Sequence, residues 1–301
     1  AVCLLGEDVG APGGPFGATQ GLLDRFGPER VRDTPISEAA LAGLATGAAM
    51  LGIRPVIEIM FFDFILLALD QLVNHTAKMR FMSGGVHKVP LTVITACGAR
   101  RNTGPQHSQT FDAMLGNIPG LRVVWPSTPA DAKGLLKSAI RCDDPVVFIE
   151  SLNLWRLLGD VAEEEYMVPL GQANVVREGM DLTLVGVGSI MPTLLQVADR
   201  LGNEGISCEV IDLRSLAPLD LETIAASVSR TGRLVVAHDS PPALGLGAAL
   251  VGHLAEPLFG KLRSAPRVVA PPGSPAPFNP SLEDLYYPDV VAVAEAIRAT
   301  L

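Results

Sequence analysis

A single carboxylate, Glu38, stands at the start of a predicted helix of small residues. Thr34, Pro35 and Ser37 precede it, and hydroxyl groups and proline suit the unpaired backbone N–H groups of a helix start. The helix, over residues 38–52, is mostly Ala and Gly. Each glycine costs up to about 1 kcal/mol relative to Ala, so this composition indicates close approach by another backbone or by a ligand. Glu38 therefore serves either the helix dipole or a ligand beside the helix.

A histidine, His107, lies in a long loop predicted over residues 96–110. Loops of this length inside a compact domain are usually functional or disordered. An imidazole changes its charge near neutral pH, so it suits proton transfer in an active site. A loop histidine is also commonly a plain surface residue, and the residue type alone leaves both interpretations open.

An aromatic residue, Phe64, ends the run Phe61-Phe62-Asp-Phe64. Aromatic rings at this spacing pack a core, and they also stack against flat heterocyclic ligands. The run of residues alone does not decide between these two interpretations.

The elements that must position these residues alternate between strands and helices. In the first half we expect strands at 2–5, near 31, and at 54–61, 89–95, 121–125 and 145–150, and helices at 18–26, 38–52, 63–82 and 128–140. In the second half we expect strands at 182–187, 208–212 and 233–237, and helices at 191–202, 221–230, 245–258 and 288–301. This alternation predicts an α/β protein with two doubly wound, mainly parallel sheets. We place one domain at 1–155, a linker at 156–168 and a second domain at 169–301.

Composition excludes several classes of partner. The 301 residues are 48% hydrophobic and 18% charged, with a net charge of −9, so no basic surface for nucleic acid is expected. The most apolar run, 56–69, is interrupted by Glu58 and Asp63 and is too short to cross a membrane. The high apolar fraction instead indicates extensive buried surface between subunits.

The four cysteines are scattered without a CxxC pair or a zinc-type spacing, which indicates a reducing compartment. No signal or transit peptide is visible, and the sequence opens at Ala1 without a methionine in a strand-like run. We expect a cytoplasmic protein, with the mitochondrial matrix as the alternative for a processed chain.

Several longer phrases resemble the beta subunit of the thiamin-diphosphate-dependent decarboxylating component of 2-oxo acid dehydrogenase complexes, a member of the transketolase-like superfamily. These phrases include Gly6-Glu-Asp-Val-Gly10, Arg32-Asp-Thr-Pro-Ile-Ser-Glu38, Phe62-Asp-Phe64, Met82-Ser-Gly-Gly85 and Gln106-His-Ser-Gln109. They cover nearly all of the first 150 residues, and the match persists more weakly through 208–220. The resemblance implies a pyrimidine-binding domain followed by a transketolase-type C-terminal domain. It also implies oxidative decarboxylation of a 2-oxo acid in the pyruvate or branched-chain class.

The resemblance assigns roles to four residues. Glu38 would contact the ring nitrogen of the thiamin aminopyrimidine, which favours the imino tautomer that removes a proton from the thiazolium carbon. Ile36 and Phe64 would lie against that ring. His107 would stand at the mouth of the site and assist transfer of the acyl group to lipoamide.

The resemblance also implies a potassium ion held largely by backbone carbonyls. The matching residues are Leu91, Ala139, Ile140, Cys142 and Asp144. Cys142 replaces an acidic residue of the family, although a hard cation prefers oxygen ligands.

One family motif is missing from this chain. The Gly-Asp-Gly sequence that holds the cofactor's diphosphate and Mg²⁺ does not occur in the 301 residues. The resemblance therefore implies an alpha subunit that supplies it in an α2β2 heterotetramer, with thiamin diphosphate at the interface. A lipoyl acyltransferase component would then accept the acyl group.

Three stretches depart from the family pattern: 95–99, 238–248 and 278–280. They leave open two enzymatic alternatives, a transketolase-like or acyloin-forming enzyme and an acyl donor to a carrier protein. A non-catalytic scaffold subunit is a further alternative, and the joint presence of Glu38, Phe64 and His107 argues against it.

Overall fold

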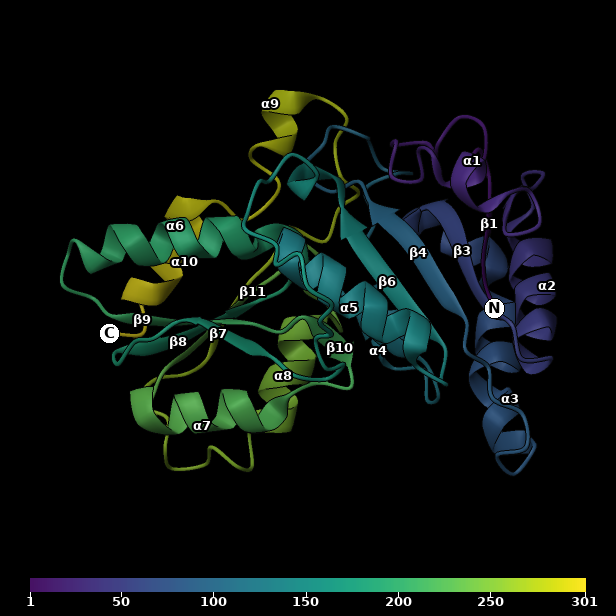
Figure 1. Cartoon of the computed structure of the whole chain (residues 1–301). Helices are drawn as coiled ribbons and strands as arrows, with labels where there is room; N and C mark the ends of the chain where they lie inside the picture. Colours follow the sequence, from purple (N-terminus) through teal and green to yellow (C-terminus); the bar gives the residue numbers. More distant parts are fainter.

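The computed structural model describes all residues from 1 to 301 and contains two β-sheets, one centred on each half of the chain (Figure 1). The first half contains β1 (Val2–Gly6), α1 (Leu22–Phe26), β2 (Val31–Asp33), α2 (Glu38–Met50), β3 (Arg54–Phe61), the 3₁₀ helix η1 (Phe62–Ala68), the π-helix η2 (Gln71–Thr76), α3 (Ala77–Met82), β4 (Thr92–Cys97), α4 (Asp112–Gly116), β5 (Arg122–Val124), α5 (Pro129–Arg141), β6 (Val146–Ser151) and the 3₁₀ helix η3 (Leu152–Leu154). The second half contains β7 (Asn174–Arg177), β8 (Leu182–Gly186), the 3₁₀ helix η4 (Gly188–Ile190), α6 (Met191–Gly202), β9 (Cys208–Asp212), β10 (Ser215–Ala217), α7 (Leu221–Thr231), β11 (Leu234–Ala237), α8 (Leu246–Leu254), β12 (Arg267–Val269), α9 (Pro280–Glu283) and α10 (Val290–Arg298).

The first sheet has the strand order β10-β5-β6-β4-β3-β1-β2, and every pair except β10–β5 is parallel. Its central strands are apolar on both faces, as expected for a parallel sheet covered on both sides. Ile57 and Ile59 of β3 join the core with Leu41 and Ala45 of α2, whereas α5 covers the opposite face. Because the strands run in one direction, their carboxyl ends meet at one edge.

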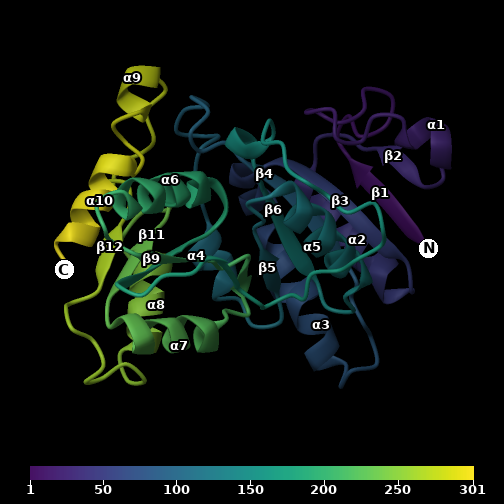
Figure 2. The same ribbon diagram turned by 60° about the vertical axis from the view of Figure 1, so that its left-hand side comes forward.

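The second sheet has the order β12-β11-β8-β9-β7, with β7 antiparallel at its edge. Helices α6 and α10 cover one face, and α7 and α8 cover the other (Figures 1 and 2). Side-chain caps start two of these helices: Asp220 accepts from the Thr223 N–H at 3.0 Å, and Asp289 accepts from the Ala292 N–H at 2.7 Å. The predicted α/β class with two mainly parallel sheets is confirmed.

Strand β10 comes from the second half of the chain but belongs to the first sheet. It follows β9 directly and pairs antiparallel with β5, with Ser215 opposite Val124 and Ala217 opposite Val123. One continuous hydrophobic core also contains residues of both halves, including Ile57 and Val236. The two halves are therefore joined through a sheet as well as through the chain.

The single helix predicted over residues 63–82 is wrong, because the structure divides this segment into η1, η2 and α3. The π-helix widens where the Thr76 hydroxyl donates to the Gln71 carbonyl at 2.8 Å and lies 2.6 Å from the Thr46 hydroxyl. A side chain inserted in this way disturbs the regular helical ladder. The short strands β7, β10 and β12 were also not expected.

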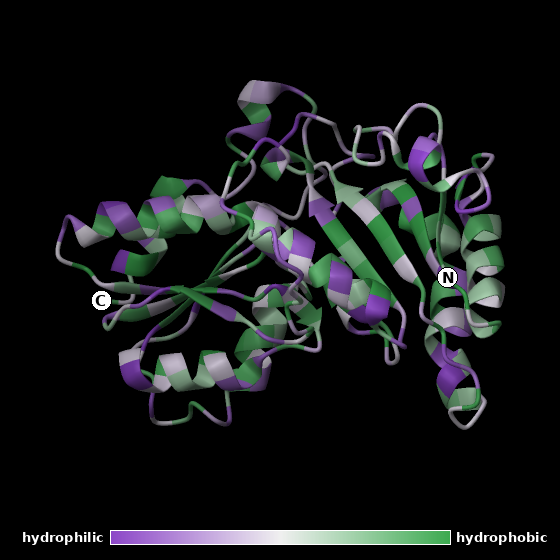
Figure 3. Cartoon of the chain, in the orientation of Figure 1, coloured by the Kyte–Doolittle hydropathy of each residue, from purple (hydrophilic) through white to green (hydrophobic).

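Apolar side chains also lie on the outside of the molecule. Figure 3 shows α2 at the outer edge of the first half, pale or hydrophobic along most of its length. Leu44 and Leu51 are 62% and 87% exposed, and Gly47 has open space around the position of a Cβ. This exposed face of α2, built from Ala40, Gly43, Leu44, Gly47 and Leu51, is called the α2 face below. None of the helices combines the length and the apolar character needed to cross a membrane.

Candidate active site

Three of the predicted site residues, Glu38, Phe64 and His107, lie on segments at the carboxyl edge of the first sheet. Glu7 directly follows β1, and Glu38 begins α2 shortly after β2 ends. η1, which carries Phe64, continues from β3, and the loop 98–111, which carries His107, continues from β4. Since β1, β3 and β4 are parallel neighbours, these segments come together although they lie far apart in sequence.

Glu38 is a buried carboxylate that is 7% exposed and belongs to none of the chain's ion pairs. It is the first residue of α2, where the helix dipole favours a negative charge. Glu38 also affects the neighbouring Glu7. Partial burial raises the pKa of Glu7, and the negative charges of Glu38 and then Asp8 raise it further. The carboxylate oxygens of Glu38 are not among the fully enclosed polar atoms that lack a partner, so a ring nitrogen presented from outside this chain can reach them.

His107 and Phe64 are brought together. The His107 ring stands edge-on to Phe64, with 5.3 Å between ring centroids, and edge-on to Phe61 at 4.7 Å. Phe61 in turn contacts Phe16 at 5.6 Å, and Phe16 contacts Trp155 at 4.9 Å. Sequence reasoning missed Phe61, Phe16 and Trp155. The only available signal for Phe61 was its place in the Phe61–Phe64 run, which also fits plain core packing.

A buried acid beside Phe64 secures the far end of the His107 loop. Asp63 accepts from the Gln109 backbone N–H at 3.2 Å and from its side-chain Nε2 at 2.8 Å. Burial raises the pKa of Asp63, while the bonds from Gln109 oppose that rise. The contact ties η1 to the loop, so Phe64 and His107 keep their mutual placement.

Ile36 lies apart from this aromatic cluster. Its side chain is 80% exposed, two residues before the buried Glu38. An isoleucine this exposed presents an apolar surface to another molecule or to solvent. Its predicted contact with the aminopyrimidine stays a prediction.

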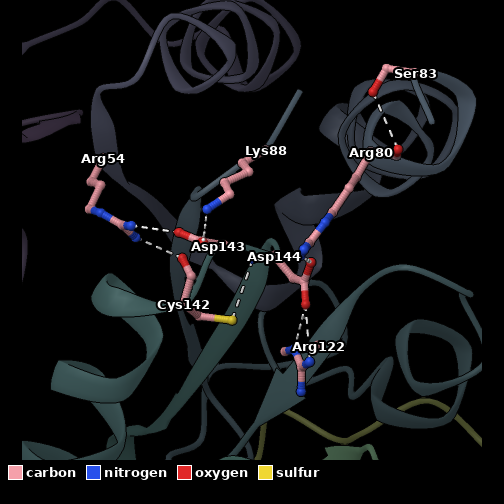
Figure 4. A network of polar contacts seen from close by, with 8 residues as sticks. All are labelled: Arg54, Arg80, Ser83, Lys88, Arg122, Cys142, Asp143 and Asp144. Atoms are coloured by element: carbon pink, nitrogen blue, oxygen red, sulfur yellow. Dashed lines mark hydrogen bonds and ion pairs between the residues drawn. The ribbon is translucent and has the colours of Figure 1, made fainter. Parts of the chain in front are cut away.

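The residues predicted to hold potassium lie at the opposite edge of the sheet, before β4 and at the end of α5: Leu91, Ala139, Ile140, Cys142 and Asp144. Arg54 already reaches this turn. Its Nη1 donates to the Cys142 carbonyl at 2.8 Å (Figure 4). The same atom donates to the Ile140 carbonyl at 3.0 Å. Its Nη2 donates to Asp143 at 2.6 Å, and Lys88 donates to the other oxygen of the same carboxylate at 2.6 Å.

These contacts do not suit a metal ion at the turn. A cation bound to the Ile140 and Cys142 carbonyls would lie close to the positive guanidinium of Arg54, and like charges repel. Two more of the predicted carbonyls have backbone partners: that of Leu91 accepts from Val146 at 2.9 Å, and that of Ala139 accepts from Cys142 at 3.1 Å. The geometry therefore does not favour potassium here.

A cavity of about 260 Å³ lies between the first sheet and α5. Glu58 and Glu150 both line it, and burial raises the pKa of each to about 7. The negative charge of Glu58 also raises the pKa of Glu150. Sequence reasoning missed this pair, because nothing in the residue pattern places β3 and β6 on the same cavity.

Comparisons with known proteins agree with this geometry. Residues 1–156 match the family model "Transketolase, pyrimidine binding domain", and residues 171–293 match "Transketolase, C-terminal domain". The chain is 43% identical over 311 residues to the beta subunit of acetoin:2,6-dichlorophenolindophenol oxidoreductase from Cupriavidus necator, covering 100% of this chain and 92% of that protein. It is 42% identical over 301 residues to the beta subunit of the pyruvate dehydrogenase E1 component from Bacillus subtilis, again covering 100% and 92%.

Two further relatives extend this picture. The 2-oxoisovalerate dehydrogenase subunit beta of Bacillus subtilis is 41% identical over 299 residues, covering 99% of this chain and 91% of that protein. Among solved structures, a split-gene transketolase described as an inactive beta4 tetramer matches with a TM-score of 0.78 and 25% identity, covering 100% of this chain and 92% of the other. The chain therefore belongs to the transketolase family, in the group formed by the beta subunits of 2-oxo acid dehydrogenases.

Proposed function

We propose that this chain is the beta subunit of a thiamin-diphosphate-dependent 2-oxo acid dehydrogenase. Together with an alpha subunit, it would decarboxylate a 2-oxo acid oxidatively and pass the acyl group to lipoamide. The observation that carries the proposal is the buried, unpaired carboxylate of Glu38 at the same sheet edge as Phe64 and His107. Buried acids without a partner of their own are typical of sites completed by a ligand.

Each residue has a definite task in this proposal. Thiamin diphosphate, when bound, supplies a carbon nucleophile and an electron sink for the bond to carbon dioxide. Glu38 holds the proton of the pyrimidine ring nitrogen and so selects the tautomer that can act as a base. Phe64 and Ile36 give the ring apolar surface and exclude water from it.

His107 serves the acceptor side of the site. Its ring is only partly buried and stands edge-on against Phe61 and Phe64, which fixes its plane. An imidazole at the mouth can take up a proton and then deliver it to the sulfur of lipoamide that is released as a thiol. The lipoyl acyltransferase component would present that lipoamide.

The chain needs a partner to complete the site. It lacks the Gly-Asp-Gly motif, and nowhere do three His, Cys, Asp or Glu residues gather in a group that could hold a metal ion. We propose that an alpha subunit binds the diphosphate and Mg²⁺ and that the assembly is an α2β2 heterotetramer. The α2 face suits a permanent subunit interface, because it is exposed, apolar and rich in small residues. We do not extend the proposal to potassium, because the cationic Arg54 side chain donates to two of the predicted carbonyls.

The compartment follows from the cysteines. All four are free in the structure, although Cys97 and Cys208 are too deeply buried to form disulfides with other molecules. We propose the reducing environment of the cytoplasm, or of the mitochondrial matrix for a processed chain.

A second candidate substrate is acetoin. Two relatives at 43% identity are named for acetoin, as close as those named for pyruvate or 2-oxoisovalerate. Cleaving the carbon–carbon bond next to a hydroxyl needs the same nucleophile and the same carboxylate partner as decarboxylation. The roles of Glu38 and Phe64 are therefore unchanged for this substrate.

The test is the variant Glu38→Gln in the assembled complex with its partner. Product formation would be measured with pyruvate, branched-chain 2-oxo acids, 2-oxoglutarate and acetoin, using 2,6-dichlorophenolindophenol as the electron acceptor. We expect a loss of about 10²–10⁴-fold on the working substrate, with the complex still assembled. Glu29→Gln is the matched control, because Glu29 is exposed and pairs only with Arg32 at the surface. Full activity of the Glu38→Gln complex would refute the proposal.

A further inference from the structure

The three stretches that depart from the family pattern meet around the His107 loop, residues 98–111. They lie far apart in sequence, at 95–99, 238–248 and 278–280. The first leads directly into the loop, and residues in or just beyond the other two bind it from the second half of the chain. These three stretches are therefore assembled at one place.

Arg100 makes the strongest of these contacts. Its Nε and Nη2 donate to the two oxygens of Asp239 at 2.7 and 2.6 Å, and Nη2 also donates to the Pro288 carbonyl at 2.9 Å. The guanidinium lies 5.1 Å from the centroid of the Tyr287 ring. The Asp239 carboxylate is fully buried and also accepts from the Ser189 hydroxyl at 2.6 Å. A paired, hydrogen-bonded contact of this kind fixes direction as well as distance.

Asn102 makes a second contact two residues further on. Its backbone N–H and its Nδ2 both donate to Oε2 of Glu283, at 2.8 and 2.6 Å. Glu283 is 4% exposed, and its other oxygen, Oε1, has no partner. Burial raises the pKa of Glu283, and the hydrogen bond from the Asn102 backbone opposes the rise. The hydrogen bonds of the Glu283 carboxylate thus come from the loop.

The loop backbone is bent so that these contacts can form. Arg100 and Asn102 adopt φ angles of 65° and 55°, in the left-handed region that costs non-glycine residues free energy. Such a conformation persists only where surrounding contacts hold it, and the two carboxylates of the second half do so here. Phe278 also packs directly on Gly104, because a Cβ at Gly104 would lie 2.9 Å from the Phe278 ring.

The bend is transmitted to His107 within the loop. The Thr103 hydroxyl lies 2.9 Å from the Gly98 carbonyl and 3.0 Å from the His107 carbonyl. The two ends of the loop touch at Gly98, since a Cβ there would lie 1.9 Å from the His107 carbonyl oxygen. On the far side, the Ser240 hydroxyl donates to Asp112, where the loop ends, at 3.0 Å. A shift at residues 100–102 must therefore displace the backbone of His107.

We propose that Arg100 and Asn102 are positioning residues, which hold His107 at the mouth of the site through Asp239 and Glu283 of the second half. The inference rests on the proposed function, because it gives His107 its task in transfer to lipoamide. The second half of the chain then has a direct part in the acceptor step. Neither positioning residue touches the substrate or the cofactor.

The first experiment measures the loop itself. Hydrogen–deuterium exchange would be followed in peptides covering 98–111, in the assembled complex. We expect Arg100→Met combined with Asp239→Asn to exchange at least about tenfold faster there, because removing both charges frees the loop without leaving one buried charge unpaired. Arg101→Met is the matched control, since it makes the same substitution at the neighbouring position, where the side chain is exposed. Unchanged exchange in 98–111 overturns the inference.

If the double variant Arg100→Met with Asp239→Asn fails to fold, a second pair of changes tests the inference instead. Asn102→Ala removes the Nδ2 contact, and Glu283→Gln keeps the shape of the acid without its charge. Each is expected to speed exchange in the same peptides, and Glu283→Gln by less. Neither change leaves an unpaired buried charge. If neither changes the exchange of the loop, the second contact does not position it.

The second experiment tests the route through His107. We expect Arg100→Met with Asp239→Asn to slow transfer to lipoamide about tenfold or more, and to leave turnover with the artificial electron acceptor within about twofold. The slowing should disappear in a His107→Ala background, because the positioned group is gone. Equal slowing in both backgrounds overturns the inference. If His107→Ala alone leaves transfer unchanged, the role proposed for His107 fails, while the exchange measurement still decides whether the loop is held.

Discussion

Glu58 and Glu150 are two acids that share one cavity beneath α5. Burial raises the pKa of each to about 7, and no lysine or arginine is among the causes that shift either pKa. In the unfolded chain both would titrate near 4.3. The folded protein therefore binds these protons more tightly than the unfolded chain does between about pH 4.5 and 7. Stability from this pair is present at low pH and falls as the pH rises through that window.

The pair predicts a pH dependence that can be removed. Replacing Glu58 and Glu150 together by Gln should raise the free energy of unfolding at pH 8 by on the order of 1–3 kcal/mol, after a discount for partial solvent access. At pH 5, where the acids are already neutral, the same change should have little effect. Calorimetric unfolding of the variant and the parent from pH 5 to 8 measures both. Parallel curves for the two proteins would show that the pair does not titrate in this range.

The sequence prediction named Glu38, Phe64 and His107 as site residues, but not the residues around them. Glu38, Phe64 and His107 belong to phrases with a strong family pattern, and the structure brings Phe64 and His107 together. Phe16 and Trp155 join the same aromatic cluster from separate segments. Their spacing in the sequence carries no sign of this, because only the tertiary fold brings such segments into contact.

In the turn between α5 and β6, the positive charge comes from an arginine side chain. Arg54 of β3 donates to the Ile140 and Cys142 carbonyls, and Asp143 balances its charge. The next residue, Asp144, pairs with Arg80 and Arg122, which ties α3 and β5 to the same turn. The turn is thus ordered by side chains of the chain itself.

This arrangement predicts a protein that does not need potassium for stability. The unfolding temperature should differ by less than about 1 °C between potassium chloride and choline chloride at equal ionic strength. Arg54→Met should lower it by several degrees in either salt, because it leaves the Ile140 and Cys142 carbonyls without this donor and Asp143 with Lys88 alone. Arg267→Met, at an exposed position of β12, is the control. If the unfolding temperature of the parent protein is higher in potassium chloride than in choline chloride, the predicted metal site is supported after all.

Regular elements were predicted well where their pattern was long. α6 and β9 have the expected bounds, and α5 begins within one residue of the expected start, where the Thr128 hydroxyl accepts from the Asp131 N–H at 3.1 Å. The failure at 63–82 has a local cause: the Thr76 hydroxyl bonds to a carbonyl five residues earlier. Apolar spacing in a sequence is the same for an α-helix and for a helix widened by one such contact.

The outer surface of the whole molecule points to its assembly. The α2 face is uncovered, and a Cβ at Gly47 would meet nothing within 4 Å. Small residues on an exposed helix let a second helix or sheet approach closely. In the proposed heterotetramer this face would be buried against another subunit.

A bulky residue on the α2 face should therefore weaken assembly without harming the fold. We expect Gly47→Leu to leave the unfolding temperature of the isolated chain unchanged or slightly raised, because leucine favours helix over glycine. Association with the partner subunit should weaken about tenfold or more, measured by analytical ultracentrifugation. Gly252→Leu is the matched control, because Gly252 lies on exposed α8 with equally open space around it. Equal association of both variants would place the interface elsewhere.

The position of β10 limits how this gene could be divided. Its relatives include a transketolase already split into separate genes. A further cut near residues 156–170 would separate β10 from β5, so the amino-terminal fragment would carry a bare sheet edge. Such a fragment would tend to recruit strands from other chains. Fission at this point would therefore require a new edge strand to evolve first, which favours the inheritance of both halves as one polypeptide.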